Sequence, residues 1–431
     1  MSSSSALFSF FFLSLLFSIV KAAVPLSATF QFVNEGEFGD YVVEYGGNYR
    51  VLSVSNSPFQ LCFYNTTPNA YTLALRMATT RSESLFRWVW EANRGKPVRE
   101  NATLTFGTEG NLVLADADGT VAWQTNTANK GVAGFKLLSN GNIVLHDSKG
   151  NFIWQSFDHP TDTLLVGQSL RVGGVTKLVS RASAKENKDG PYSFVMESKR
   201  LALYYQIKNS PSPVVYSAPE LWKTQGTFEY VKFNSAPEND DNFAYELTLE
   251  LSTGGNLILG RPKYNATLSI LRLGVDGNLR IFTYYDKVDW GAWEETFTLF
   301  SRDSVWENEC QLPERCGKFG VCDEYQCVGC PSEKGLLGWS QQCEAKKLSS
   351  CGVNDFHYYK VEGVDHFLNK YNSGIGPIKV DECGKKCTTD CKCLGYFYNQ
   401  DTSRCWIAYE LKTLTKVSNS THFGYVKVPN K

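Results

Sequence analysis

Twelve of the thirteen cysteines lie between Cys310 and Cys405, so thiol chemistry is the first chemistry that this sequence offers. Thiols at such a density persist as disulfides in an oxidising compartment. A zinc site at Cys327-Val-Gly-Cys330 is the alternative, because two thiolates at that spacing can share a metal ion. Six closely spaced cysteines in one small secreted module favour disulfides, and we therefore expect no metal.

Acid–base chemistry has one candidate pair, Asp158-His159, but no nucleophile is placed beside it. The motifs of serine hydrolases, zinc proteases and phosphate-binding loops are absent. The histidines are scattered at His146, His159, His357, His366 and His422. Paired carboxylates for glycoside hydrolysis, which could converge from distant strands, are the alternative that sequence leaves open. We predict a non-catalytic protein without a cofactor.

The N-terminus and the overall charge predict a secreted protein. Residues 1–22, with the apolar stretch from Ala6 to Val20, have the length and the small residues of a cleavable signal peptide. No later run is long and apolar enough for a membrane span. Lys and Arg number 43 and Asp and Glu 44, which gives no field to attract nucleic acid. Four sequons predict N-glycosylation, at Asn65, Asn101, Asn265 and Asn419.

The cysteine-poor part, from Val24 to Ser301, must supply the scaffold for any site. It is rich in aromatic and β-branched residues, with turn residues at short intervals, which predicts an all-β structure. One hairpin unit occurs twice, from Gly110-Asn to Trp123 and from Gly141-Asn to Trp154. Trp90 precedes Trp123 by 33 residues, and Trp123 precedes Trp154 by 31. Three small sheets with converging tryptophans could share a core that none buries alone.

Weaker copies of the hairpin occur at Gly255-Asn-Leu-Ile-Leu and Gly277-Asn-Leu-Arg-Ile-Phe, and they predict a second, related β-domain. The first segment resembles the plant bulb-type (G-type, curculin-like) lectin domain, a three-sided β-prism. The stretch Trp154-Gln-Ser-Phe-Asp-His-Pro-Thr-Asp-Thr-Leu-Leu resembles the hallmark of S-locus glycoproteins. That resemblance implies a turn closing the prism, in which Asp158 and Thr161 satisfy backbone amides, rather than a catalytic site.

The same resemblance implies mannose sites of the pattern Gln-x-Asp-x-Asn-x-Val-x-Tyr, in which polar side chains bind hydroxyls and Val gives an apolar floor. The matching positions that keep or nearly keep the pattern are Glu109, Asn111, Val113, Asn140, Asn142 and Val144. Both copies lack the Gln and the Tyr, so weak or multivalent binding is expected. Alternatively, Asn111 and Asn142 are present because Asn after Gly suits the turn.

The C-terminal part resembles two cysteine-rich modules. Cys310 to Cys343 resemble an epidermal-growth-factor-like module, which implies the pairs Cys310–Cys322, Cys316–Cys327 and Cys330–Cys343. Asp381-Glu-Cys-Gly-Lys-Lys-Cys387 and the following residues resemble a PAN (apple) domain, which implies the pairs Cys383–Cys405, Cys387–Cys393 and Cys351–Cys391. Since Cys383 and Cys387 are four residues apart, a short helix would present both on one face.

The predicted order is a signal peptide (1–22), a bulb-type lectin domain (23–172), a second lectin-like β-domain (173–304), a growth-factor-like module (305–345) and an α+β PAN domain (346–428). The strand Phe59-Gln-Leu-Cys-Phe-Tyr and the stretch Trp88-Val-Trp-Glu-Ala-Asn-Arg make the chain similar to plant epidermis-specific secreted glycoproteins. The unpaired Cys62 is either a buried thiol or an intermolecular disulfide in a homodimer.

Two functions are consistent with this sequence. The first is a secreted, lectin-like glycoprotein of the extracellular space or cell wall that binds mannose-type glycans of wall polymers or glycoproteins weakly or multivalently. The second is a structural or protein-binding wall glycoprotein with degenerate sugar sites. Neither involves nucleic acid or a membrane span.

Overall fold

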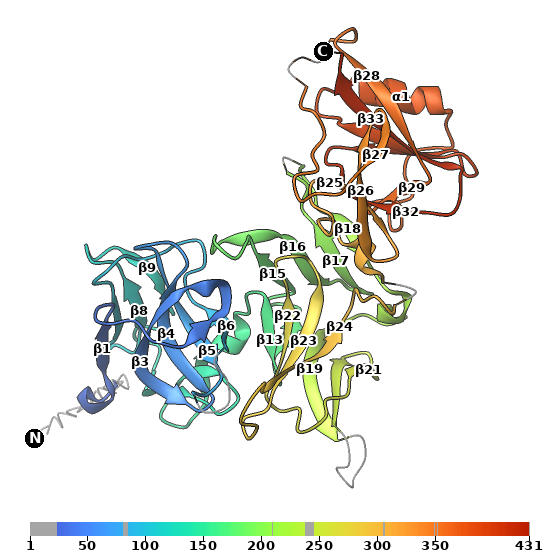
Figure 1. Cartoon of the computed structure of the whole chain (residues 1–431). Helices are drawn as coiled ribbons and strands as arrows, with labels where there is room; N and C mark the ends of the chain where they lie inside the picture. The colour runs from blue at the N-terminus through green and yellow to red at the C-terminus, as the bar shows by residue number, and fades with distance from the viewer. Residues whose placement is uncertain are drawn as a thin grey trace, which may run out of the picture.

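The computed structural model describes residues 24–80, 85–208, 210–237, 245–304, 307–348, 350 and 352–430. The predicted signal peptide and Cys351 lie outside these residues. Two β-prisms stand side by side, and a cross-linked C-terminal unit adjoins the second prism (Figure 1). The predicted mainly β fold is confirmed, and within the described ranges α1 (Val380–Thr388) is the only α-helix. The short 3-10 helices are η1 (Leu26–Ala28), η2 (Glu44–Gly46), η3 (Ser156–Asp158), η4 (Glu220–Trp222) and η5 (Glu309–Gln311).

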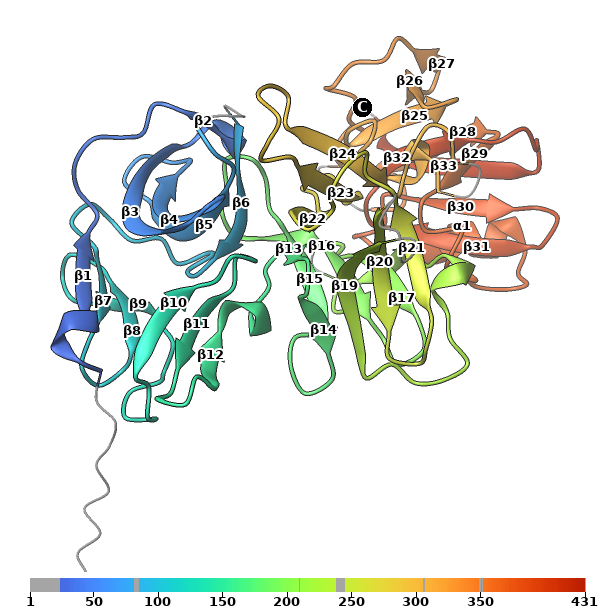
Figure 2. The ribbon, with the colours of Figure 1, turned by 90° about the horizontal axis from the view of Figure 1, so that it is seen from below.

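Three sheets surround the core of the first prism, as the hairpin repeat predicts (Figure 2). One sheet has the order β1-β7-β8-β9, with β1 (Phe30–Val33), β7 (Thr103–Phe106), β8 (Leu112–Ala115) and β9 (Val121–Gln124). The next is β10-β11-β12, with β10 (Gly134–Leu137), β11 (Ile143–His146) and β12 (Phe152–Gln155). The third is β2-β6-β5-β4-β3, with β2 (Val42–Val43), β3 (Asn48–Asn56), β4 (Phe59–Asn65), β5 (Tyr71–Met77) and β6 (Leu85–Glu91).

The three repeated tryptophans meet, as predicted from their spacing. The ring centroids of Trp90 and Trp123 lie 5.9 Å apart, those of Trp90 and Trp154 6.2 Å, and those of Trp123 and Trp154 5.8 Å. All three pairs are edge-to-face, which suits the opposite charge of ring edge and ring face. Each sheet thus contributes one ring to a common cluster.

The Gly-Asn turns that open the repeats need glycine. Gly110 and Gly141 have φ angles of +79° and +85°, which side chains rarely adopt. A Cβ on Gly110 would also lie 2.6 Å from Val132, and one on Gly141 would lie 2.8 Å from Phe59. The turn sequence therefore allows the hairpins to pack tightly on the core.

The second prism also has three sheets, and each of them has four strands. The first is β13-β22-β23-β24, with β13 (Thr163–Leu165), β22 (Ser269–Leu273), β23 (Leu279–Tyr284) and β24 (Trp293–Thr298). The second is β14-β19-β20-β21, with β14 (Ser169–Arg171), β19 (Tyr230–Pro237), β20 (Tyr245–Leu251) and β21 (Asn256–Gly260). The third is β15-β16-β17-β18, with β15 (Lys177–Arg181), β16 (Asp189–Met196), β17 (Leu201–Tyr205) and β18 (Val214–Ser217).

The predicted boundary after residue 172 is wrong. Strands β13 and β14 pair with β22 and β19, so the second prism already includes Thr163. Their partners follow about 60 to 110 residues later in the chain, as in the pair Leu164↔Leu271. Local patterning does not reveal pairings at such separation, which is why the sequence misplaced the boundary.

The C-terminal unit is built on two sheets. One has the order β27-β26-β25-β32-β29, with β25 (Phe319–Asp323), β26 (Gln326–Ser332), β27 (Gly335–Leu337), β29 (Val364–His366) and β32 (Lys412–Lys416). The other is β28-β33-β30-β31, with β28 (Phe356–Glu362), β30 (Gly395–Asn399), β31 (Arg404–Ala408) and β33 (His422–Pro429). Because β25 pairs in parallel with β32, the two cysteine-rich segments share one sheet instead of forming separate modules.

Five of the six disulfides implied by the resemblance are the pairs that the structure forms. Cys383 and Cys387 project from one face of α1, are fully buried, and reach Cys405 and Cys393. Cys391 is also disulfide-bonded, and its predicted bond to Cys351 remains a prediction, since Cys351 is not among the described residues.

Candidate functional site

The six residues predicted to bind sugar belong to two sheets of the first prism. Glu109, Asn111 and Val113 lie in the turn before β8 and in β8. The second set lies in the corresponding turn and in β11, and comprises Asn140, Asn142 and Val144. The structure therefore gives two separate triplets, one for each hairpin.

The amide of Asn111 is used inside the fold. Its Oδ1 accepts hydrogen bonds from the backbone N of Thr127 (3.0 Å) and the Oγ1 of Thr125 (3.0 Å), and its Nδ2 donates to Gln124 Oε1 (2.8 Å). An amide oxygen has two lone pairs, so the oxygen is saturated and one N–H of Nδ2 remains. With only 6% of the residue exposed, Asn111 mainly holds the loop after β9. This is a structural role, but it acts on the loop after β9 and not on the turn before β8 that the sequence suggested.

Asn142 repeats the arrangement in the next hairpin. Its Oδ1 accepts from the backbone N of Phe157 and the Oγ of Ser156, each at 3.2 Å, and its Nδ2 donates to Gln155 Oε1 (2.9 Å). The exposed Asn140 accepts from the backbone N of Asn142. Two copies of one bonding pattern show that the asparagine of each Gly-Asn turn holds the non-strand segment that follows the tryptophan of the same hairpin.

The predicted role of Val144 as an apolar floor is contradicted by its burial. Val144 is 0% exposed, so a sugar ring has no access to it, whereas Val113 in the first hairpin is only half-buried. Both copies of the sequence motif have valine at this position, so the residue type does not distinguish them. The difference arises from what packs over each sheet, which the local sequence does not encode.

Gln124 and Gln155 were missed as site residues. Each follows a tryptophan of the repeat, and its Oε1 accepts a hydrogen bond from the Nδ2 of Asn111 or of Asn142, respectively. The signal was present in the duplicated Trp-Gln dipeptide, since a polar residue repeated beside a core residue needs a polar partner.

An open polar row remains on the first of the two sheets. The strand registers align Gln31, Thr105, Val113 and Gln124 across β1, β7, β8 and β9. Gln31 Nε2 donates to Thr105 Oγ1 (3.3 Å), and Glu109 is exposed in the turn before β8. This row offers amide, hydroxyl and carboxylate groups around a valine, which is a chemistry suited to a weakly bound sugar.

The corresponding place in the second prism is filled by an ion pair. Arg280 donates from Nη1 and Nη2 to the two carboxylate oxygens of Asp276 (3.0 and 2.7 Å). Asn278 bonds both backbone groups of Phe300, with Oδ1 accepting at 3.0 Å and Nδ2 donating at 2.9 Å. The hairpin geometry is thus kept while its surface is occupied by the protein's own charges.

Asp158 and His159 are structural, but not in the predicted way. Among the described residues, Asp158 accepts from Arg171 Nη2 (2.5 Å) and Gln155 Nε2 (3.1 Å) rather than from backbone amides, and Thr161 Oγ1 has no hydrogen-bond partner. The His159 ring stacks on Trp154 with centroids 5.4 Å apart, and burial lowers the pKa of the imidazole. These surroundings indicate that the His159 side chain has a packing role rather than a role in proton transfer. Among the described residues, no group of three metal-ligating side chains occurs.

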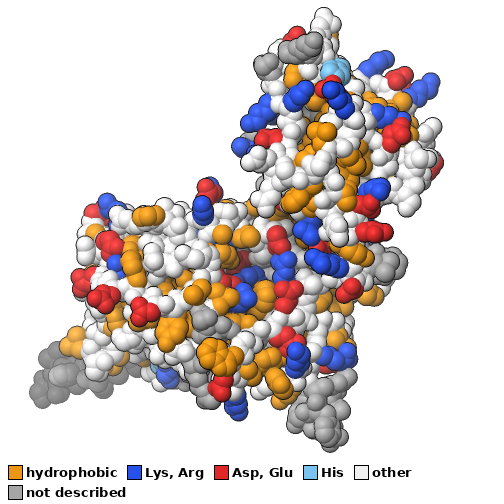
Figure 3. All heavy atoms as spheres, viewed as in Figure 1, with side chains coloured by type: hydrophobic (Ala, Val, Ile, Leu, Met, Phe, Trp, Pro, Cys, Tyr) orange, Lys and Arg blue, Asp and Glu red, His pale blue; other side chains and the backbone are white. Residues whose placement is uncertain are grey.

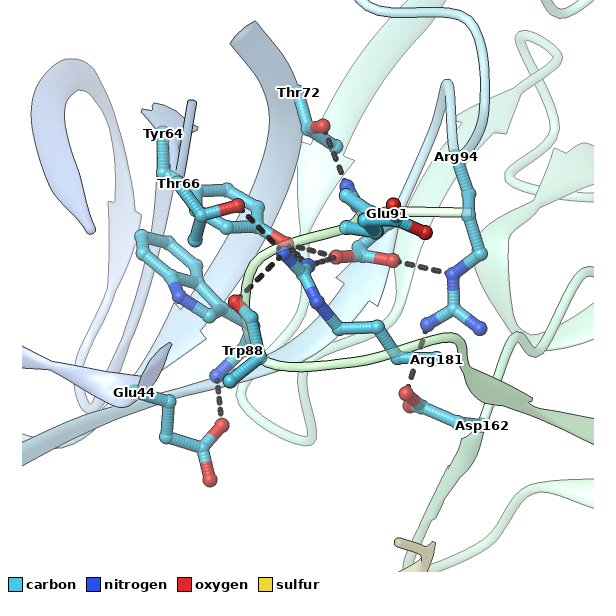
Figure 4. Close-up of polar contacts among 12 residues, drawn as sticks. Glu44, Tyr64, Thr66, Thr72, Trp88, Glu91, Arg94, Asp162 and Arg181 are labelled. Atoms are coloured by element: carbon cyan, nitrogen blue, oxygen red, sulfur yellow. Dashed lines mark hydrogen bonds and ion pairs between the residues drawn. The ribbon is translucent and has the colours of Figure 1, made fainter. Parts of the chain in front are cut away.

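Buried charges join the two prisms (Figure 4). Glu91 accepts from Arg94 Nε (2.6 Å), and Arg94 Nη2 also donates to Asp162 (2.8 Å). Arg181 Nη1 donates to Tyr64 Oη (2.5 Å), whose hydroxyl in turn donates to Glu91. Burial alone would raise the pKa of Asp162, but nearby Arg94 and Arg272 lower it below its ordinary value.

A second branch of the same network involves Glu44. Its carboxylate accepts from Arg87 Nη1 (2.5 Å) and Arg272 Nη1 (2.6 Å). The Arg87 guanidinium also lies over the ring of Phe282, 4.0 Å from its centroid. Since Arg272 and Phe282 belong to β22 and β23, these contacts fix the second prism against the first. Elsewhere, charges of both signs are interspersed on the visible surface (Figure 3).

Three of the four predicted glycan acceptors are exposed: Asn101, Asn265 and Asn419. Asn65 is only 5% exposed at the end of β4, so it is the one predicted acceptor that the fold buries. Cys62 is 0% exposed, and burial raises the pKa of its thiol to about 12. An intermolecular disulfide at Cys62 is therefore incompatible with this fold.

None of the helices in the described part of the chain has the length and apolar character needed to cross a membrane. Comparison with known families places a D-mannose binding lectin domain at residues 87–186 and an S-locus glycoprotein domain at residues 222–338. Prism, hairpins and disulfide-rich unit together thus define a lectin-like glycoprotein.

Individual relatives match along most of the chain. EP1-like glycoprotein 3 of Arabidopsis thaliana is 53% identical, over 95% of this chain and 94% of the relative. The epidermis-specific secreted glycoprotein EP1 of Daucus carota is 60% identical, over 79% of this chain and 92% of the relative. The chain belongs to this family of EP1-like secreted glycoproteins. Scilla campanulata agglutinin, a two-domain lectin of known structure, aligns with 62% of the chain at 16% identity and a TM-score of 0.19, which is too low to support an argument.

Proposed function

We propose that this protein is a secreted, non-catalytic glycoprotein of the extracellular space or cell wall that binds mannose-type glycans weakly, with avidity from multivalent presentation. The observation that carries the proposal is the polar row around Val113, which stays accessible on the first hairpin while the second hairpin is closed by the burial of Val144. Weak affinity follows because the amide oxygen of Asn111 is already saturated by the fold.

Secretion is supported by the five disulfides and by relatives that include a secreted glycoprotein. Avidity is needed because a site with few free hydrogen-bonding groups has low intrinsic affinity. Several copies on one surface raise the effective concentration without any new contact.

A glycan array with the intact glycoprotein and a Val113→Asp variant tests the mannose site. Val113 is half-buried on the outer face, so a charge there changes the face without entering the core. Ile258→Asp is the matched control, since Ile258 is also a β-branched strand residue and is 50% exposed. We expect mannose-rich glycans to be retained by the wild type and the control and lost by Val113→Asp.

A structural or protein-binding role is the second candidate. It is favoured by the internal use of both asparagine amides, Asn111 and Asn142, which leaves the hairpins intact whether or not a sugar binds. Retention on cell-wall material that persists in the Val113→Asp variant and in excess free mannose would support this role over the first.

A further inference from the structure

We propose that the cleft between the two prisms is a second binding site, for neutral oligosaccharides. This inference rests on the proposed role in glycan recognition and deepens it, because it places a larger contact away from the hairpin faces. The cleft holds about 560 Å³, within the range of pockets that enclose small ligands.

The two walls of the cleft come from different prisms. Gln155, Phe157 and Asp158 of the first prism form one wall. Strands β14, β19 and β20 of the second prism form the other, which includes Ser169 and Lys232. Neither prism alone provides the site.

Polar side chains on the second wall stand in a row. The strand registers place Ser169 opposite Lys232, and Lys232 opposite Glu250. Their neighbours Val231 and Leu249 are fully buried, so the alternation of a strand turns the polar row outward into the cleft. The row is a continuous edge of hydrogen-bonding groups.

Free hydrogen-bonding capacity is concentrated in this row. Among the described residues, the Lys232 ammonium and the Ser169 hydroxyl contact no hydrogen-bonding or charged partner within bonding distance. Glu250 accepts from Tyr230 Oη (3.1 Å) and Asn234 Nδ2 (3.3 Å), and keeps further lone pairs. An ammonium, a hydroxyl and a carboxylate in line suit a ligand with several hydroxyl groups.

The charges of the cleft favour a neutral ligand. Arg171 and Asp158 form an ion pair across the two walls at 2.5 Å, and so neutralise each other. What remains is one cation, Lys232, and two carboxylates, Glu229 and Glu250, a net charge of −1. An acidic sugar would be repelled by this balance.

Apolar surface is also present, in the half-buried rings of Phe157 and Tyr230. Rings beside hydrogen-bonding groups match the two kinds of surface on a sugar, its C–H faces and its hydroxyls. The buried pairs Glu44–Arg272 and Arg94–Asp162 hold the walls in place before a ligand arrives. Such preorganisation reduces the entropy lost on binding.

Titration calorimetry on the intact glycoprotein tests the cleft, with mannotetraose and cellotetraose as neutral probes and tetragalacturonate as the acidic probe. The test variant is Lys232→Met/Glu250→Gln, which keeps side-chain size and removes charge. We expect it to bind the preferred neutral probe about ten-fold more weakly or worse, since the ammonium donor is lost and the carboxylate is replaced by a neutral, weaker acceptor. Ile258→Asp is the matched control, because Ile258 is 50% exposed and lies outside both sites, and it should leave this binding unchanged. Val113→Asp reports on the hairpin site. Thermal unfolding of each variant verifies that the fold is intact.

Each outcome separates the cleft from the hairpin site. Loss in the cleft variant, with or without loss in Val113→Asp, supports the cleft. Loss in Val113→Asp alone supports the hairpin site of the proposed function and overturns the cleft. Binding that neither variant changes overturns both sites, as does a wild type that binds no neutral probe. Stronger binding of tetragalacturonate than of either neutral probe overturns the neutral ligand class.

Discussion

Arg272 of the second prism places Nη1 2.6 Å from both carboxylate oxygens of Glu44 in the first prism. The side chains are only 5% and 9% exposed. Burial opposes the positive charge of Arg272, but Glu44 more than compensates and raises the pKa of the guanidinium. The pair therefore links the two prisms, together with the contacts Arg181–Tyr64 and Arg87–Phe282.

Removing one partner of the Glu44–Arg272 ion pair should strongly destabilise the protein. Arg272→Met leaves Glu44 with its charge buried and, within the described ranges, only Arg87 as a cationic partner, so we expect the free energy of unfolding to fall by about 3 to 5 kcal/mol. Arg99→Met is the control, because Arg99 is 52% exposed in its pairs with Asp116 and Asp118, where water screens the charges, and its loss should have a much smaller effect. Denaturant unfolding measures both. Equal effects of the two changes would contradict the buried role of Arg272.

Stability should depend on pH through His366. Burial lowers the pKa of this imidazole to about 3, while a bond from Nε2 to the carbonyl of Glu410 (3.1 Å) acts in the opposite direction. The unfolded chain, with a pKa near 6.5, binds one proton more between about pH 6.5 and pH 3. The stabilisation is therefore complete above about pH 6.5 and decreases on acidification, by up to about 1.4 kcal/mol per pH unit.

Replacing His366 with Gln removes that titration. In this pH window, we expect the slope of the unfolding free energy against pH to decrease by the equivalent of up to one bound proton. This expectation does not depend on the absolute stability of the variant. His357→Gln, at a side chain 44% exposed, is the control for the loss of an imidazole outside the core. A slope unchanged in His366→Gln would show that the imidazole does not stay neutral in the folded state.

The tryptophan cluster should be a stability centre of the first prism. Trp123→Ala removes two edge-to-face contacts, with Trp90 and with Trp154, and opens a cavity where three sheets meet. We expect a loss of about 3 kcal/mol, with Trp123→Phe losing less because a ring remains. Urea unfolding followed by near-ultraviolet circular dichroism measures the loss. A change below about 1 kcal/mol would mean that the three rings do not form one core.

Local features of the fold were predictable because they are written in short stretches. Gly110-Asn and Gly141-Asn encode turns with positive φ, and the spacing of Trp90, Trp123 and Trp154 encodes their meeting point. The helix with Cys383 and Cys387 on one face follows from an interval of four residues.

Long-range features were not predictable, because they join residues far apart in the chain. The partner of Glu44 is 228 residues away at Arg272, and β25 pairs with a strand some 90 residues later. At the candidate site, a sequence motif was enough to predict which polar residues lie in the two hairpins. The burial of Val144, however, depends on packing that no local pattern specifies.

Whether a sequon carries a glycan should depend on the exposure of its asparagine and not on the presence of the sequon alone. Asn101, Asn265 and Asn419 are exposed and should be occupied, whereas Asn65, only 5% exposed in β4, should be unmodified in the folded, secreted protein. Mass spectrometry of glycopeptides, with enzymatic deglycosylation in heavy-oxygen water to mark former sites, measures this. A high occupancy at Asn65 would require β4 to end differently from the strand seen here.

The C-terminal segment should not fold well without the segment before it. Strand β32 pairs in parallel with β25 over Phe319↔Lys412 to Cys322↔Thr415, and Thr413 Oγ1 accepts from the backbone N of Cys316 (2.9 Å). A fragment of residues 346–428 would expose that edge of β32, and unpaired edges promote aggregation. We expect it to show poor amide dispersion in NMR spectra and to aggregate, whereas a fragment of residues 307–430 keeps the shared sheet and stays monomeric. A well-dispersed spectrum for the shorter fragment would show that its disulfides suffice without the shared strand.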